Sequence, residues 1–148
     1  MEEFVITVNG KGHLTRRESF DLEFKQAFHY GDSLHEYVRS LVGMANNRGG
    51  QIIFGIQDSP RIPVGLQNDK FENLDPTKLN AVILEYFSSD LSYVIESFEW
   101  DGKAFGVLKV SEARVKPLYA ANRMAENFEK VRSITGTVGK RKKLDTLN

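Results

Sequence analysis

Hydrophobic and polar residues alternate along residues 19–25, where Phe20, Leu22 and Phe24 occupy every second position. A period of two is typical of a half-buried β-strand, because successive side chains of a strand point to opposite faces. The pattern therefore predicts a strand that buries these three side chains and presents acidic residues and Lys25 on its other face.

Apolar residues then recur at the spacing of an α-helix. They are Leu34, Val38, Leu41 and Ala45. Ser33 followed three residues later by Glu36 forms a capping-box pattern, which predicts that the helix begins at Ser33. The Asn and Gly residues within 46–50 are expected to end it, because both residue types tolerate a left-handed backbone.

Residues 51–57 form a continuous apolar run around the sequence IIFGI. Such a run predicts a strand that is buried on both faces. Gly55 within it indicates a bulge or a close approach of two backbones. Strand, helix and strand together predict a β-α-β unit over residues 19–58.

The second half of the chain carries signals for a helix and a hairpin. Asp75 followed by Pro76 predicts the start of the helix, since Asp is a good N-cap and Pro suits the first helical position. Residues 91–100 and 103–110 are strand-like runs joined by an Asp-Gly pair, which predicts a tight β-hairpin.

Two shorter alternating runs, Phe4–Val8 and Val131–Thr137, predict further strands near the ends of the chain. A length of 148 residues with 41% hydrophobic residues suits one folded domain with an ordinary core. We therefore expect a single α+β (α/β) domain over residues 1–148. It would have a mixed β-sheet of five or six strands and two main helices.

The composition excludes several classes of protein. The chain contains no cysteine, which excludes disulfides, thiol catalysis and thiolate metal sites, and favours a reducing compartment. No apolar run approaches the roughly 20 residues that span a bilayer, and the first ten residues do not resemble a signal peptide. We expect a soluble cytoplasmic protein without a membrane partner.

Charge is distributed unevenly although the net charge is zero. Residues 113–148 hold nine Lys or Arg and three Asp or Glu, a balance of +6, and residues 1–112 have a balance of −6. Four consecutive basic residues, Lys140, Arg141, Lys142 and Lys143, are the densest part. A basic end can bind nucleic acid, although a solvated tail is the commoner interpretation on composition alone.

Three carboxylates could form a catalytic metal site. Glu18 and Glu23 are five residues apart, so they share a face only if Glu18 lies before the strand. Asp58 follows the predicted buried strand, and open α/β sheets place their sites at the carboxyl ends of strands. Three carboxylates there would suit Mg²⁺ or Mn²⁺, which can activate water for phosphodiester hydrolysis, while Lys25 stabilises the phosphate charge. On spacing alone, solvated acids at strand ends are the commoner interpretation.

The segments ESFDLEFK, LVGMANNRGGQIIFGIQD and VGL resemble the Schlafen-type AlbA-like domain family, a DNA-binding family formerly tied to divergent AAA proteins. The resemblance covers residues 17–66 in register. The positions that carry it are Glu18, Glu23, Phe24, Lys25, Ala45, Asn46, Gly49, Gly50, Gly55, Asp58, Gly65 and Leu66.

The resemblance implies a nucleic-acid-binding domain, often the N-terminal domain of a longer protein. In the Schlafen proteins two Glu and one Asp form the active site of a metal-dependent endoribonuclease that acts on structured RNA. Those acids fall on Glu18, Glu23 and Asp58, with Mg²⁺ or Mn²⁺ as the implied cofactor. Lys25 and Lys140–Lys143 are the candidate contacts to RNA or DNA.

This chain also departs from the family pattern. It has a strand-like Phe4–Val8 where the family has a helix, and KVRSITGTVGKRKK only partly matches the family's later motif. A non-catalytic transcription-regulator module, or a protein-interaction unit that forms a homodimer, therefore stays open as the alternative. An ATPase is disfavoured, because Gly136–Lys140 lacks the spacer and the following Ser/Thr of a phosphate-binding loop.

Overall fold

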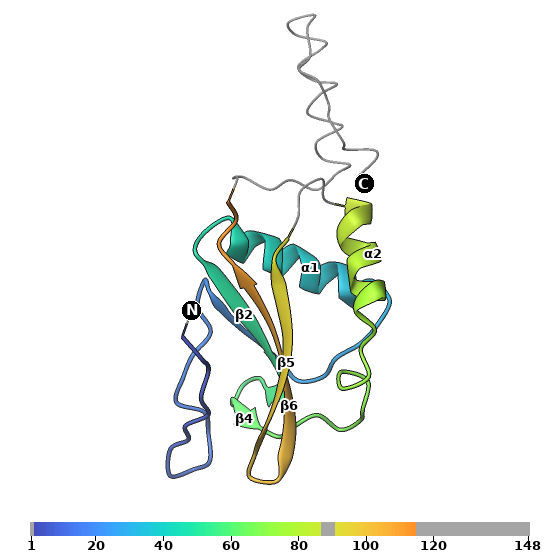
Figure 1. Cartoon of the computed structure of the whole chain (residues 1–148). Coiled ribbons are helices and arrows are strands. Elements are labelled where there is room, and N and C mark those ends of the chain that lie inside the picture. The colour runs from blue at the N-terminus through green and yellow to red at the C-terminus, as the bar shows by residue number, and fades with distance from the viewer. Residues whose placement is uncertain (1, 87–90, 115–148) are drawn as a thin grey trace, which may run out of the picture.

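A mixed four-stranded sheet forms the centre of the protein in a computed structural model, which describes residues 2–86 and 91–114 (Figure 1). Its strand order is β1-β2-β6-β5. The strands are β1 (Leu22–Lys25), β2 (Gly49–Phe54), β6 (Lys103–Ser111) and β5 (Tyr93–Trp100). β1 pairs with β2 in parallel, as the predicted β-α-β unit requires, and β5 pairs with β6 antiparallel, as the predicted hairpin requires. β2 and β6 are also antiparallel.

Two helices and a second small sheet complete the described part. The helices are α1 (Asp32–Ala45) and α2 (Pro76–Tyr86), and β3 (Ile56–Gln57) pairs with β4 (Ile62–Pro63). The predicted α+β class is confirmed, with the strands of this part divided between sheets of four and two. The predicted strand Val131–Thr137 and the basic run Lys140–Lys143 lie outside the described residues. No helix of the described part is long and apolar enough to cross a membrane.

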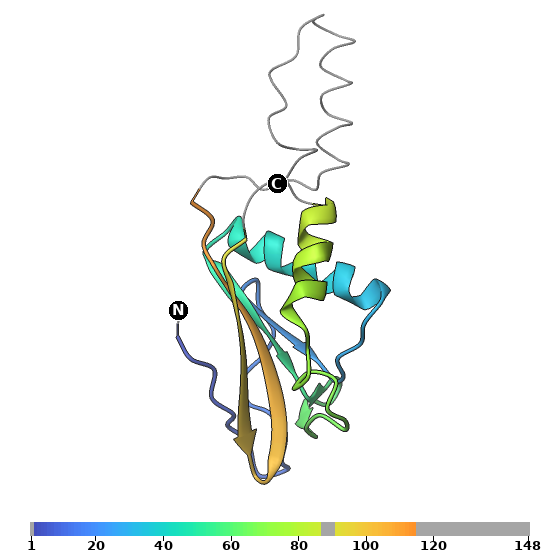
Figure 2. The same cartoon turned by 45° about the vertical axis from the view of Figure 1, so that its right-hand side comes forward.

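The sheet separates two hydrophobic cores. Both helices pack on one face, and residues from the start of the chain pack on the other (Figure 2). All six residues of β2 are buried, as the apolar run predicted, but the predicted strand 51–57 is divided at Gly55, and Ile56–Gln57 form β3 of the small sheet. Ile52 and Phe54 belong to the core under the helices, whereas Ile53 belongs to the core that contains Phe4 and Ile6.

The start of α1 differs from the prediction. The helix begins at Asp32 after Gly31, which has φ +72°, and no side chain caps it, so the capping box of Ser33 and Glu36 is wrong. The backbone closes the first turn instead, because the Leu34 amide donates to the Gly31 carbonyl at 3.0 Å. The predicted apolar stripe of α1 is buried as expected.

Two local signals in the second half are confirmed. The Asp75 carboxylate accepts a hydrogen bond from the Thr77 amide at 2.9 Å, as an N-cap of α2 should. Asp101 and Gly102 have φ of 53° and 72° and join β5 to β6. Positive φ at both central residues is the geometry that makes Asp-Gly a hairpin turn.

Two predictions for the segment before β1 are wrong. Phe4–Val8 is not a strand, although Phe4 and Ile6 are buried and Val8 forms an isolated bridge to Leu14. The chain turns back between them, where the Asn9 side chain accepts hydrogen bonds from two backbone amides. Phe20, predicted to be buried, is 63% exposed because the chain turns before β1 begins.

Candidate functional site

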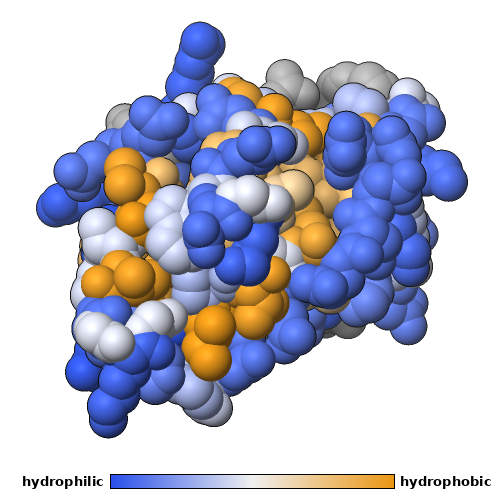
Figure 3. Space-filling view, turned by 90° about the horizontal axis from the view of Figure 1, so that it is seen from below, coloured by the Kyte–Doolittle hydropathy of each residue, from blue (hydrophilic) through white to orange (hydrophobic). Residues whose placement is uncertain are grey.

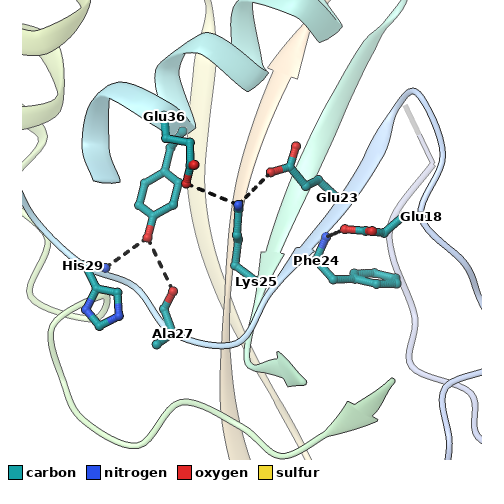
Figure 4. A network of polar contacts seen from close by, with 8 residues as sticks. Glu18, Glu23, Phe24, Lys25, Ala27, His29 and Glu36 are labelled. Carbon is teal, nitrogen blue, oxygen red and sulfur yellow. Dashed lines mark hydrogen bonds and ion pairs between the residues drawn. The ribbon is translucent and has the colours of Figure 1, made fainter. Parts of the chain in front are cut away.

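The ammonium group of Lys25 lies between two carboxylates (Figure 4). Its nitrogen is 3.3 Å from an oxygen of Glu23 and 3.4 Å from an oxygen of Glu36. Glu23 and Lys25 alternate with the buried Leu22 and Phe24 on β1, while Glu36 comes from the start of α1. Two acids around one base leave this cluster with a net negative charge, so Lys25 is not a free contact for a phosphate.

The pKa of Lys25 follows from these neighbours. Partial burial acts to lower the pKa, but the carboxylates of Glu23 and Glu36 outweigh it and raise the pKa above its usual value. Lys25 therefore stays protonated at neutral pH, where it can act as a fixed positive charge and not as a general base.

Glu18 lies outside the regular strand, as a shared site with Glu23 requires, but its carboxylate has another role. An oxygen of Glu18 accepts a hydrogen bond from the Phe24 amide at 2.8 Å. The carbonyls of Asp21 and Lys25 bond to β2 and to Gly55, so the alternate residue Phe24 points its amide to the free edge of β1. Glu18 thus satisfies a backbone donor at an edge strand of the described sheet.

Replacing Glu18 by alanine should lower the free energy of unfolding by about 0.5–1.5 kcal/mol, because the Phe24 amide loses its acceptor. Glu18→Gln keeps an amide oxygen and should retain most of the stability. Urea-induced unfolding monitored by circular dichroism measures both values. Asp58→Ala is the control, since Asp58 is exposed and should change stability little. Equal stability of the alanine variants would show that Glu18 does not hold the edge.

Asp58 lies in the turn between β3 and β4, beyond the end of β2. Its carboxylate accepts a hydrogen bond from the Ser59 hydroxyl at 3.4 Å. Arg61 in the same turn donates to the backbone carbonyls of Arg16 at 2.9 Å and Leu14 at 3.2 Å. These two hydrogen bonds, which no sequence pattern indicated, hold the turn of Asp58 against the segment that leads into Glu18.

The three predicted metal ligands do not form a metal site as they lie. Among residues 2–86 and 91–114, no three Asp, Glu, His or Cys side chains gather closely enough to hold a metal ion. Glu18 accepts from a backbone amide, Glu23 pairs with Lys25, and Asp58 accepts from Ser59. The arrangement does not fit Mg²⁺ or Mn²⁺, and metal binding stays a prediction.

The end of the molecule that carries β4 and the β5–β6 turn is largely hydrophilic (Figure 3). The hydrophobic residues on this face form small, separate patches between polar side chains. A protein-binding face usually presents a broad contiguous apolar patch, so this view gives no support to protein docking at this end.

Two solved structures are similar to parts of the chain. One is a protein of Corynebacterium diphtheriae with 19% identity and a TM-score of 0.48, covering 87% of this chain and 27% of that chain. The other, from Nitrosomonas europaea, is the N-terminal domain of a protein described as related to the ATP-dependent DNA helicase RecG. It has 27% identity and a TM-score of 0.46, covering 70% of this chain and 71% of that chain.

A relative with higher sequence identity and a family model show which family the chain belongs to. An uncharacterized ATP-binding protein of Ureaplasma parvum is 36% identical over 122 residues, which cover 74% of this chain and 34% of the relative. This chain therefore spans about a third of that relative. The sequence model of the Schlafen AlbA_2 family matches residues 18–143, from the first predicted acid to the end of the basic run. The chain belongs to the Schlafen AlbA_2 family.

Proposed function

We propose that this chain is a nucleic-acid-binding domain of the Schlafen AlbA_2 type. One observation carries the proposal: the family match extends to residue 143 and so includes the basic run Lys140–Lys143. The region that the family model matches thus includes these four basic residues. Cationic residues bind nucleic acid by neutralising phosphates and releasing counterions, which makes the binding tolerant of sequence and sensitive to salt.

The described site supports a restricted role for Lys25 in this binding. Its charge is already balanced by Glu23 and Glu36, so an added phosphate would meet a cluster that is negative overall. We therefore assign phosphate contacts to Lys140–Lys143 and not to Lys25, which serves to hold β1 against α1.

The test is fluorescence anisotropy with labelled RNA and DNA over a series of salt concentrations. Replacing all four residues of Lys140–Lys143 by Gln should weaken binding and reduce the dependence of log K on log salt by about 0.7–0.9 for each lost phosphate contact. The matched control removes four exposed charges elsewhere, at Lys11, Arg39, Lys70 and Lys78. Equal loss in both variants would show that only net charge matters, and no binding by wild type would overturn the proposal.

Metal-dependent cleavage of structured RNA is the finer hypothesis, and it has its own test. Its ligands would be Glu18, Glu23 and Asp58, which here accept from the Phe24 amide, pair with Lys25 and accept from the Ser59 hydroxyl. Wild type and Glu23→Ala should be incubated with a folded tRNA-like RNA and Mn²⁺. Cleavage by wild type alone would support the hypothesis, whereas equal cleavage by both, or none by either, would end it.

Two other activities, ATP binding and dimerisation, are considered for the same protein. The Ureaplasma relative is named for ATP binding, but these 148 residues contain no phosphate-binding loop pattern, so we do not assign ATP binding to them. A protein-interaction or dimerisation module is the non-enzymatic alternative. A dimer mass in light scattering, together with no affinity for nucleic acid, would favour that alternative.

A further inference from the structure

Phe20 is an aromatic side chain that the fold leaves in solvent. It is 63% exposed, although its neighbours Leu22 and Phe24 are buried. The chain makes a tight turn there, because the Ser19 amide donates to the Leu22 carbonyl at 2.9 Å and the Leu22 amide donates back at 3.2 Å. Phe20 therefore lies at the tip of a two-residue turn, beyond the start of the core strand.

This turn is held firmly from both sides. The Ser19 hydroxyl donates to the Asp21 carboxylate at 2.7 Å. The Asp21 carbonyl accepts from the Gln51 amide at 3.0 Å, which anchors the turn to β2. Gly50 lies so close that a Cβ there would be 2.9 Å from the same carbonyl. Phe20 thus belongs to a hydrogen-bonded turn that is anchored to β2.

Two exposed arginines and two acids lie in or near the turn, either along the chain or beside the start of β2. Arg17 and Arg48 are exposed, and their side chains have no partner among the described residues. Arg17 lies two residues before Ser19, where the turn begins, and Arg48 lies two residues before Gly50, which contacts the turn. The acids Glu18 and Asp21 accept hydrogen bonds from the Phe24 amide and the Ser19 hydroxyl, which are neutral donors and do not cancel the carboxylate charge.

An exposed aromatic ring on an anchored turn, with exposed arginines nearby in the chain and next to the paired strand, suits a nucleobase better than a protein surface. Stacking on a base needs one exposed ring, with cations that take the neighbouring phosphates. Protein docking needs a broad apolar patch, and the other exposed large hydrophobic residues of the described part are aliphatic and lie on other elements. Those residues are Val5, Val8, Leu84 and Val94.

We propose that Phe20 stacks on an unpaired base of a single-stranded nucleic acid whose phosphates contact Arg17 and Arg48. This inference rests on the proposed nucleic-acid binding and adds that the domain recognises unpaired bases. It also places a binding surface at the turn before β1, separate from the cluster of Glu23, Lys25 and Glu36.

The experiment compares wild type and Phe20→Ala on two fluorescein-labelled strands of equal length, an oligothymidylate and an abasic strand. We expect Phe20→Ala to weaken binding to oligothymidylate by about 5- to 100-fold, since one stacked base is lost. Binding to the abasic strand should be the same for both proteins. Phe20→Tyr, which keeps the ring, should bind as wild type, and an oligouridylate arm shows whether RNA behaves likewise.

Matched controls separate stacking from other effects. Leu84→Ala removes a comparably exposed apolar side chain, 49% exposed, from α2 and should not change binding. Arg17→Gln and Arg48→Gln should each reduce the salt slope by about 0.7 on a single strand.

Unchanged binding by Phe20→Ala would overturn this inference while leaving nucleic-acid binding intact. An equal loss on both strands, or a change of oligomeric mass in Phe20→Ala, would also overturn it. Absence of binding by wild type would overturn this inference and the proposed function together.

Discussion

Replacing Gly55 by alanine should lower the free energy of unfolding by about 2–5 kcal/mol, through backbone strain and overpacking together. Gly55 has φ +116°, a conformation that side-chain-bearing residues rarely adopt. A Cβ there would lie 2.6 Å from Cδ2 of Phe105 and 3.3 Å from Cα of Gly65. Neither neighbour can retreat easily, because Phe105 is buried and the other contact is backbone.

The position of Gly55 explains why the loss should be large. Its amide donates to the Lys25 carbonyl at 2.8 Å, and its carbonyl accepts from the Gly65 amide at 2.9 Å. It therefore links β1, the end of β2 and the strand β4 that returns past it. A shift here would displace both the turn of Asp58 and the end of β1.

Urea-induced unfolding followed by circular dichroism measures this loss, with Gly43→Ala as the matched control. Gly43 is an exposed residue of α1, and a Cβ there would meet nothing within 4 Å. Alanine favours the helix over glycine, so this control should raise stability by up to about 1 kcal/mol. Similar stability of the two variants would show that the backbone at Gly55 can adopt another conformation without cost.

Elements that depend on local signals were predictable from the sequence. The Asp75 cap, the Asp-Gly hairpin and the buried face of α1 each depend on residues close together in the chain. Gly55 was also recognisable, because glycine inside an apolar strand indicates a close approach. Its neighbour Phe105 was not, since that contact joins segments far apart in the sequence.

The wrong predictions concern residues whose structure depends on a backbone group or on a partner that is distant in the sequence. Ser33 and Glu36 fit a capping box, but the backbone of Gly31 closes the helix, and Glu36 pairs with Lys25 instead. Phe20 fits the alternation of β1, but the turn at Ser19 removes it from the core. Periodicity assumes a regular element and cannot show where that element begins.

The candidate acids show that the geometry of a site is also hard to predict from the sequence. Spacing and family pattern selected Glu18, Glu23 and Asp58 as candidates, and Glu18 lies before β1, as a shared site would require. The partner that each carboxylate takes could not be predicted, because a backbone amide, an ammonium group and a hydroxyl compete for them. The glycines of the family pattern have a clearer physical reason: a Cβ on Gly50 would meet Met44 and the Asp21 carbonyl below 3.0 Å.

Replacing Phe54 by alanine should lower the free energy of unfolding by about 3–5 kcal/mol, a large share of the total for a domain of this size. Phe54 is fully buried at the end of β2. Its ring centroid lies 5.4 Å from that of Phe28, 5.0 Å from Tyr37 and 5.2 Å from Phe71. Alanine would leave a cavity among these three rings, which join β2 to α1 and to the segment before α2.

Phe20→Ala is the matched control, because it removes the same side chain from an exposed position. It should change stability by less than about 0.5 kcal/mol. Chemical unfolding compares the two variants, and Phe54→Leu provides a milder core change if Phe54→Ala does not fold. A loss of more than 2 kcal/mol in Phe20→Ala would contradict the exposed turn. The expected pair of results would assign Phe54 to the fold and leave Phe20 free to act in binding, although both rings occupy strand-like positions in the sequence.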